Sequence, residues 1–400
     1  MKIIIIYQTD LCGQIPGGID GGIRGRCKWV PEDIEIKVVG LSTNIVDRPP
    51  GKWTLVKVGD KTVPFFPVDF VEDLSVKKGL PLSVRLFFGL FKYWKQIVDQ
   101  ADFLELHRIE HAFPYLFSKK ALTLILHQNM ADIRNKNSDI GWRHLPDLYF
   151  ALEKMVFNRV KFVYWVRSDA VDTYKELYPK HSAKFDFLPT WMNTDNFYRR
   201  PESEIAILKQ KMLSEFGWTQ GNEVVLITVG RLDYQKNYLL LINAFAKVVK
   251  QKPNARLIIV GEGILRPELE ACIADNDLGR SVVLAGRQLP EVFANWLNAC
   301  DLFVLSSAYE GMPNVVLEAM ACGLPVVSTR VGETPRIVNS SDCGELVSDF
   351  TPDAFAAAVL RTLDRLNKNM VQAALDSVTR FTPRNVLTRL YDAYRKAFAS

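Results

Sequence analysis

Ser306–Pro325, SSAYEGMPNVVLEAMACGLP, is the stretch that decides the fold. It lies between two short apolar runs, Leu302–Leu305 and Val326–Ser328, and this order predicts a strand, a loop, a helix and a second strand. Pro313 suits the start of the helix, and Gly323 suits the left-handed residue just after its end. In an open parallel sheet, ligands bind beyond the carboxyl ends of the strands. The loop before the helix is therefore the first candidate site.

Two carboxylates mark this site. Glu310 lies in the loop, and Glu318 lies four residues after Asn314, on the same helix face and leaning toward the helix start. Free backbone amides at that start favour an anion. A nucleotide sugar fits this pattern if Glu310 accepts from sugar hydroxyls, the amides bind the phosphates and Glu318 accepts from the ribose. The alternative is a surface helix with Glu318 in a solvated salt bridge. The predicted donor-binding residues of this segment are Gly311, Met312, Pro313, Asn314 and Glu318.

The spacing of these residues also resembles a known motif. Seven residues separate Glu310 from Glu318, and AMACGLPVV follows. This resembles the E-x7-E motif of retaining glycosyltransferases of family 4. The resemblance covers nearly the whole chain and is most specific over Val224–Val338. It implies an α/β chain with the GT-B fold, in which two Rossmann-like domains face each other across a cleft. We expect an acceptor-binding domain at residues 1–198, with a terminal helix at 383–400 crossing back to it, and a donor-binding domain at 199–382.

Length and composition agree with two globular domains. The chain has 400 residues, of which 48% are hydrophobic and 24% charged, and its net charge is +5. This mildly basic balance suits an anionic substrate or a membrane surface, and no nucleic-acid-binding motif is present. The six cysteines are scattered, which indicates free thiols in a reducing compartment. No apolar run reaches the roughly 18 residues of a membrane span, so we expect a cytoplasmic protein.

Two cations follow the apolar run Val224–Gly230. Arg231 comes directly after it, and Lys236 lies five residues later in GRLDYQKN. Fixed cations at a strand end stabilise the negative charge that grows on a departing nucleoside diphosphate. The same arrangement is similar to the diphosphate-binding pair of the family, and the alternative is a pair of solvated surface cations.

Glycines close the next strands of the predicted sheet. A base could lie against bare backbone at these positions, with Leu289 as an apolar contact, and in the family such loops hold the base. The further predicted donor-binding residues are Gly230, Gly261, Gly286, Arg287 and Leu289.

The amino-terminal half carries weaker signals. Cys12–Gly25 is rich in glycine, and Gly17 and Gly18 leave a bare backbone that a phosphate or an acceptor could approach. The alternative is a flexible surface loop. His127 ends a predicted strand, and the family resemblance implies that it meets the donor sugar in a catalytic role. His107 ends the strand before it and is a weaker candidate.

Leu82–Val98 is predicted to form one amphipathic helix. Its apolar side includes Phe91 and Trp94, and the opposite arc carries Arg85, Lys92 and Lys95 beside Phe88. An aromatic residue among cations suits an anionic lipid surface. The alternative is core packing below a solvated basic face.

Together these features predict a retaining hexosyltransferase of polysaccharide biosynthesis. The expected donor is UDP-glucose or a similar UDP-hexose, and the expected acceptor is a saccharide or a lipid-linked saccharide. A GDP-mannose-dependent mannosyltransferase is the alternative, and a UDP-sugar epimerase or a non-catalytic sugar-nucleotide-binding subunit is more distant. No D-x-D motif lies near the site, so no metal or cofactor is expected. The predicted catalytic residues are Arg231, Lys236, Glu310 and His127.

Overall fold

The computed structural model describes residues 1–13, 18–74, 79–127, 145–219 and 221–399. The chain forms two compact units: a first unit of Met1–Thr190 with Val386–Ser400, and a second unit of Trp191–Asn385. The sequence placed the first boundary later, before residue 199. The segment after Thr190 belongs to the second unit because Met192 and Phe197 pack in that unit's core, where the Met192 amide donates to the Phe381 carbonyl at 3.1 Å.

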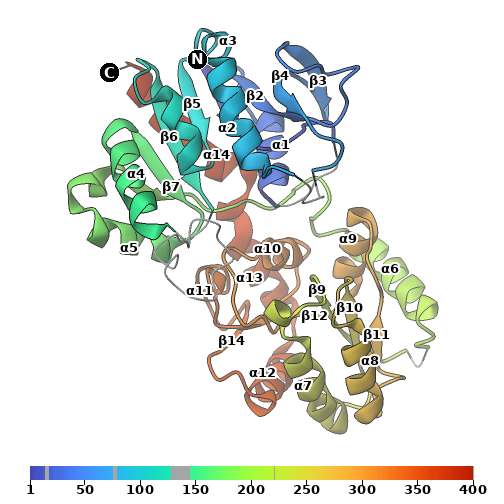
Figure 1. Cartoon of the computed structure of the whole chain (residues 1–400). Helices are drawn as coiled ribbons and strands as arrows, with labels where there is room; N and C mark the ends of the chain where they lie inside the picture. Colours follow the sequence, from blue (N-terminus) through green and yellow to red (C-terminus); the bar gives the residue numbers. More distant parts are fainter. Residues whose placement is uncertain (14–17, 75–78, 128–144, 220, 400) are drawn as a thin grey trace. The chain divides into compact units, whose positions relative to one another are not determined.

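The first unit is built on an eight-stranded sheet with the order β3-β4-β2-β1-β5-β6-β7-β8 (Figure 1). All neighbouring strands are parallel except β3 and β4, which form an antiparallel pair at one edge. The chain switches direction across the sheet between β1 and β5, so the loops after these two strands meet at one edge. The strands are β1 (Lys2–Ile6), β2 (Glu35–Ser42), β3 (Thr54–Val58), β4 (Lys61–Phe70), β5 (Phe103–Leu106), β6 (Ala121–Leu126), β7 (Phe162–Trp165) and β8 (Phe185–Phe187).

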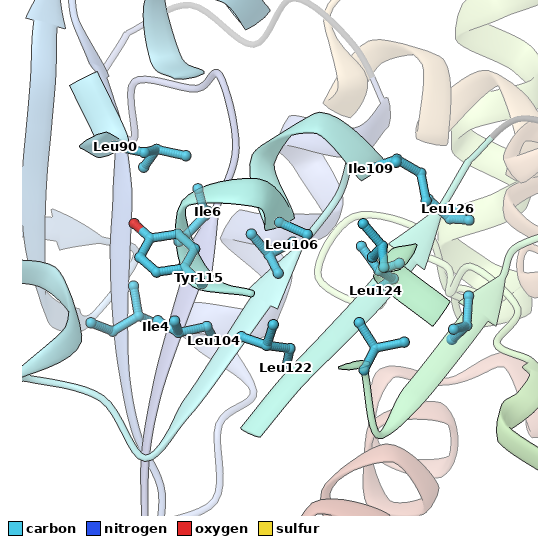
Figure 2. Packing of buried hydrophobic residues seen from close by; sticks show 14 of the residues in the cluster. Ile4, Ile6, Leu90, Leu104, Leu106, Ile109, Tyr115, Leu122, Leu124 and Leu126 are labelled. Carbon is cyan, nitrogen blue, oxygen red and sulfur yellow. The ribbon is translucent and has the colours of Figure 1, made fainter. Parts of the chain in front are cut away.

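Alternate residues of the central strands form the core of the first unit. Side chains of β1, β5 and β6 that point to one face of the sheet meet Tyr115 and Leu90 from the helices above it (Figure 2). The helices are α1 (Gly18–Lys28), α2 (Leu82–Lys92), α3 (Trp94–Val98), η1 (Ile109–Tyr115), α4 (Pro146–Arg159), α5 (Ser168–Leu177), η4 (Pro179–Lys184) and α14 (Pro383–Ala399). The end of the chain is fixed to this unit by Arg395, which pairs with Asp33 at 2.7 Å.

Two elements of the first unit differ from the sequence prediction. Most of the glycine-rich segment is helix α1, which begins at Gly18, whereas an open loop was expected. The predicted single helix Leu82–Val98 is broken at Tyr93, whose ring packs edge-on against Phe66 with centroids 5.4 Å apart. Phe91 and Trp94 were assigned to the apolar side, but they are 50% and 36% exposed.

The second unit has a six-stranded parallel sheet with the order β11-β10-β9-β12-β13-β14. This is the Rossmann order, with the change of direction between β9 and β12. The predicted alternation of strands and helices is confirmed, with boundaries shifted by a residue or two. The strands are β9 (Val224–Val229), β10 (Ala255–Val260), β11 (Val282–Leu284), β12 (Leu302–Leu305), β13 (Val326–Thr329) and β14 (Gly344–Val347).

Helices cover both faces of this sheet. One hydrophobic cluster lies between the sheet and α6, α9, α10 and α13, and another lies between the sheet and α7, α8 and α12. The four central strands, β10, β9, β12 and β13, are therefore buried on both sides, which explains their continuous apolar runs in the sequence. The helices are α6 (Glu202–Glu215), η5 (Tyr234–Lys236), α7 (Tyr238–Gln251), α8 (Arg266–Asp275), α9 (Pro290–Ala299), α10 (Asn314–Ala321), α11 (Thr334–Ile337), α12 (Pro352–Arg365), α13 (Lys368–Val378) and η6 (Thr379–Phe381).

Candidate functional site

The candidate site of the second unit lies where two loops leave the neighbouring strands β9 and β12. The Ala308 amide donates to the Gln235 carbonyl at 2.8 Å, and the Ser306 hydroxyl donates to the Lys236 carbonyl at 2.8 Å. Gln235 in turn donates its side-chain amide to the Tyr309 carbonyl at 3.1 Å. These bonds join the loops at the switch point of the sheet, the usual place for a ligand in this architecture.

Lys236 and Glu310 form the charged centre of this site. The lysine Nζ lies 2.6 Å from Oε1 of Glu310, and the Ser307 hydroxyl donates to the same oxygen at 2.7 Å. The two charged side chains are only 15% and 9% exposed. Among the described residues, Oε2 of Glu310 has no hydrogen-bond partner, so it remains able to accept from a ligand hydroxyl. Lys236 and Glu310 thus form one neutral ion pair, whereas the sequence predicted two separate roles for them.

The backbone around Lys236 fixes its side chain. A Cβ at Gly230 would lie 2.8 Å from Cε of Lys236, so the glycine leaves room for the lysine stem. Gly261 has φ +143°, and a Cβ there would lie 1.9 Å from the Gly230 carbonyl oxygen. These two glycines therefore let the ends of β9 and β10 approach each other, a structural requirement that needs no bound base.

Arg231 is placed differently from Lys236. Its side chain is 78% exposed and pairs with Asp233 at 3.2 Å. Among the described residues of the second unit, Arg231 forms no buried ion pair like that of Lys236. Arg231 is a solvated cation at the edge of the site, and an exposed pair of this kind contributes little to stability.

Glu318 projects from α10, the helix that begins after Pro313. The helix buries Val316, Leu317 and Met320, and no side chain among the described residues caps its amino terminus. The Glu318 side chain is half-buried and has no hydrogen-bond partner among the described residues. Burial raises the pKa of this carboxyl from its ordinary 4.5 to about 8. An unpaired carboxyl in this position is suited to the hydroxyls of a ligand.

The remaining donor-binding candidates lie at the ends of the next strands. Gly286 follows β11 with φ +67°, Arg287 is exposed, and Leu289 is 72% exposed at the start of α9. They share the carboxyl edge of the sheet with Lys236, two strands away. An exposed Leu289 side chain is compatible with an apolar contact to a base.

The amino-terminal candidates belong to the first unit. Gly17 lies outside the described residues, and Gly18 is the first residue of α1. His127 follows β6, and its Nε2 lies 2.8 Å from Nδ1 of His107, which follows β5. The structure thus places Lys236, Glu310 and Glu318 in one unit and His127 in the other.

Comparison with known proteins identifies the family. Residues 223–365 match the family described as "Glycosyl transferases group 1". The matched part of the second unit is therefore similar to the glycosyltransferases of this family. The family predicted from the E-x7-E motif is confirmed.

Curated relatives are glycosyltransferases as well, and solved structures show the fold. An uncharacterized glycosyltransferase of Methanocaldococcus jannaschii is 31% identical over 209 residues, or 45% of this chain and 51% of that one. A UDP-Gal:alpha-D-GlcNAc-diphosphoundecaprenol alpha-1,3-galactosyltransferase of Escherichia coli is 31% identical over 195 residues, or 48% of each chain. The chain therefore spans about half the length of these curated relatives. The Anabaena protein HepE, solved in complex with UDP, has a TM-score of 0.71 at 17% identity and covers 99% of this chain and 100% of its own. The predicted GT-B fold is confirmed.

One member of the candidate site was missed from the sequence. Ser307 is fully buried, and its hydroxyl holds Oε1 of Glu310 beside Lys236. The only sequence signal is a serine three residues before the glutamate in SSAYEG, a spacing at which a turn brings the two side chains together.

Proposed function

We propose that this glycosyltransferase moves a hexose from a nucleotide sugar to a saccharide or lipid-linked saccharide acceptor in polysaccharide biosynthesis, with retention of configuration. The Lys236–Glu310 pair at the switch point of the second sheet carries the proposal, because it places a cation and a hydroxyl acceptor within 2.6 Å of each other. Glu310 accepts from the sugar, and Lys236 with Arg231 and the α10 amides binds the diphosphate. Glu318 accepts from the ribose, and the loops after β10 and β11 hold the base.

The chemistry assigned to these residues is electrostatic. The bond between the sugar C1 and the diphosphate oxygen breaks, and an acceptor oxygen bonds to C1 on the same face. The acceptor proton passes to the departing phosphate. Lys236 stabilises the charge that develops on the leaving group, and Glu310 orients the sugar without bonding to C1.

UDP-hexose, with UDP-glucose as the first candidate, is the donor that we propose, and GDP-mannose is the alternative. The UDP-Gal donor named for the E. coli relative and the UDP bound by HepE support uridine. A thermal-shift panel of UDP, GDP, ADP and their sugars tests this choice. We expect UDP and UDP-hexose at about 100 times Kd to raise Tm by roughly 5 °C or more, and ADP to have little effect. Selective stabilisation by GDP and GDP-mannose would contradict the assignment.

Two other activities use the same donor site. An epimerase would convert UDP-sugar without an acceptor, so an epimer formed from donor alone would favour it. A non-catalytic subunit would bind the donor without turnover on any acceptor. Transfer to an added saccharide, followed by detection of the new anomeric linkage, separates glycosyl transfer from both.

We propose that transfer needs no metal ion. Within the described ranges, no group of three or more His, Cys, Asp or Glu side chains is arranged to hold a metal. Lys236 and the amides at the start of α10 supply positive charge to the diphosphate instead. We expect kcat to stay within about twofold after EDTA treatment. Removal of a required metal would instead cost several kcal/mol of transition-state stabilisation and would lower kcat much further. Loss of turnover with EDTA, restored by Mg²⁺ or Mn²⁺, would contradict the proposal.

We also propose that α2 and α3 contact an anionic membrane surface. Phe88, Phe91 and Trp94 are 61%, 50% and 36% exposed, and Lys92 is exposed beside them. Arg85, predicted to share this surface, instead pairs with Asp69 at 2.6 Å. No helix in the described part of the chain is long and apolar enough to cross a bilayer.

A vesicle assay tests this contact. Phe88→Ser combined with Lys92→Glu is expected to reduce binding to anionic vesicles about tenfold, because an aromatic anchor is lost and one charge is reversed. Phe350→Ser, which removes a 42% exposed aromatic residue of the second unit, is the matched control and should leave binding unchanged. Co-sedimentation that does not depend on anionic lipid would contradict the proposal.

A further inference from the structure

Glu105, His107 and His127 form a chain of side chains at the switch point of the first unit. Glu105 and His107 lie two residues apart at the end of β5, so both point to the same face of the sheet. His127 follows the neighbouring strand β6, which pairs with β5 through Leu106 and Leu124. Glu105 is fully buried, and His107 is 6% exposed.

Donors surround the Glu105 carboxylate. Arg26 of α1 forms an ion pair with Oε1, and the Tyr394 hydroxyl of α14 donates to Oε2 at 2.7 Å. Nε2 of His107 lies 3.2 Å from Oε1. A guanidinium only donates, so a carboxylate paired with it acts as an acceptor. His107 therefore carries its proton on Nε2 and donates it to Glu105.

The tautomer of His107 determines that of His127. The two rings are parallel within 9°, with centroids 5.2 Å apart, and Nδ1 of His107 lies 2.8 Å from Nε2 of His127. Parallel ring faces cannot approach to 2.8 Å, so this contact is an edge-to-edge hydrogen bond. Nδ1 of His107 carries no proton when Nε2 does, and the bond must use the Nε2 proton of His127.

Both imidazoles are held neutral by their surroundings. Burial lowers the pKa of His107 to about 3, and the nearby charge of Arg26 acts in the same direction. Burial also lowers the pKa of His127 well below its ordinary 6.5, with a further contribution from His107. A doubly protonated His107, which would reverse the direction of the hydrogen bond, is therefore disfavoured near neutral pH.

We propose that Glu105 and His107 fix His127 in the Nε2–H tautomer, so that its Nδ1 is presented as a hydrogen-bond acceptor for a sugar hydroxyl. Nδ1 of His127 has no hydrogen-bond partner among the described residues. His107 is then a positioning residue that acts through His127, and the sugar as ligand rests on the proposed glycosyl transfer. The competing explanation is that the hydrogen bond between the two histidines is purely structural and only pairs their buried ring nitrogens.

The carboxyl-terminal helix contributes to this arrangement. Tyr394 donates to Glu105, and the Arg26 guanidinium lies over the Tyr391 ring, 5.5 Å from its centroid. Both tyrosines are fully buried. Helix α14 thus orients the Glu105 carboxylate, which sets the tautomer of His107 and, through it, that of His127.

Nitrogen-15 NMR of histidine-labelled full-length protein tests the arrangement without any turnover. Near pH 7 we expect a pyrrole-type Nε2 and a pyridine-type Nδ1 on both His107 and His127, with a coupling across the His107 Nδ1–His127 Nε2 bond. His107→Phe should remove the coupling. His107→Asn keeps an acceptor oxygen near the former Nδ1 and should retain a protected His127 Nε2–H. A proton on Nδ1 of His127 in the wild type would overturn the proposal.

Kinetics then separate positioning from a structural role. We expect His107→Phe to lower kcat/KM about tenfold, as for loss of one oriented hydrogen bond, and His107→Asn to restore much of it. His111→Phe is the matched control. His111 is fully buried in the same unit, but it contacts the Ser83 carbonyl at 3.2 Å and not Glu105 or His127. Equal losses in His107→Phe, His107→Asn and His111→Phe would overturn the positioning role. Transfer that fails altogether while the NMR result holds would count against the proposed function and leave the tautomer assignment standing.

Discussion

Lys236→Ala is expected to lower kcat/KM by about 100-fold or more, the effect of removing one preorganised charge from a developing negative charge. The lysine is only 15% exposed, so water cannot readily replace it. The same change leaves the Glu310 carboxylate, 9% exposed, with Ser307 as its remaining partner. We therefore also expect Tm to fall. Steady-state kinetics with UDP-hexose and a saccharide acceptor, together with a melting curve, measure both effects.

The pairing of the two residues makes a stronger prediction. Because Lys236 and Glu310 neutralise each other, the double change Lys236→Ala with Glu310→Ala should destabilise the protein less than the sum of the single changes. The interaction term should be about 1–3 kcal/mol. Additive effects on both Tm and kcat/KM would contradict a functional pair.

A second ion pair of the same unit provides the control. Lys209 lies 2.7 Å from Asp301, with the two side chains 31% and 27% exposed, on α6 and just before β12. Lys209→Ala should change Tm slightly and leave kcat/KM within about twofold, because this pair is not part of the site. A loss as large as that of Lys236→Ala would show that any broken ion pair in the unit disturbs catalysis.

Arg231 should behave differently from Lys236 in the absence of ligand. It is 78% exposed, so Arg231→Ala should change the free energy of unfolding by no more than about 0.5 kcal/mol. The sequence could not distinguish the two cations, because both follow a buried strand in GRLDYQKN. Their burial depends on the loop after β12, which brings Glu310 to Lys236 and leaves Arg231 outside.

The sequence predicted the second unit well for a physical reason. The central strands are buried on both faces, so they appear as short apolar runs, and most helices have a proline or glycine near one end. The first unit was less predictable where local and tertiary preferences compete. Gly18–Lys28 has the composition of a loop but forms α1, in which Arg26 is buried against Glu105. The apolar periodicity continues through Tyr93, but the helix breaks there because the Tyr93 ring packs on Phe66.

The same limit applies to the sites. The spacing of Glu310 and Glu318 predicts a shared ligand, since one helix turn and one loop fix both positions. Contacts between distant segments have no fixed separation along the sequence, so no motif reveals them. Arg26, Glu105 and Tyr394 come from three separate parts of the chain, and the sequence alone gave no reason to join them.

Glu318→Gln is expected to stabilise the protein at neutral and alkaline pH. Burial raises the pKa of Glu318 from 4.5 to about 8 in the folded state, so the folded protein binds this proton more tightly than the unfolded chain does. Stability therefore falls as pH rises from about 4.5 to about 8 and changes no further above that range. The neutral amide removes this penalty, which amounts to at most about 5 kcal/mol. Unfolding in urea at pH 5, 7 and 9 should show an advantage for the variant that is small at pH 5 and largest at pH 9.

The stabilised variant should also reveal what the carboxyl binds. If Glu318 contacts the ribose, bound UDP gives the ionised group hydroxyl donors, and UDP should reduce the pH dependence of the wild type but not that of Glu318→Gln. Glu318→Ala should weaken UDP more than 2′,3′-dideoxy-UDP, which lacks those hydroxyls. Equal weakening of both nucleotides would refute the ribose contact, and a pH dependence equal in the wild type and Glu318→Gln would show that the carboxyl is already solvated. A binding group is expected to destabilise the ligand-free protein, because its hydrogen-bond partner is supplied only by the ligand. Binding of the ligand then removes that destabilisation.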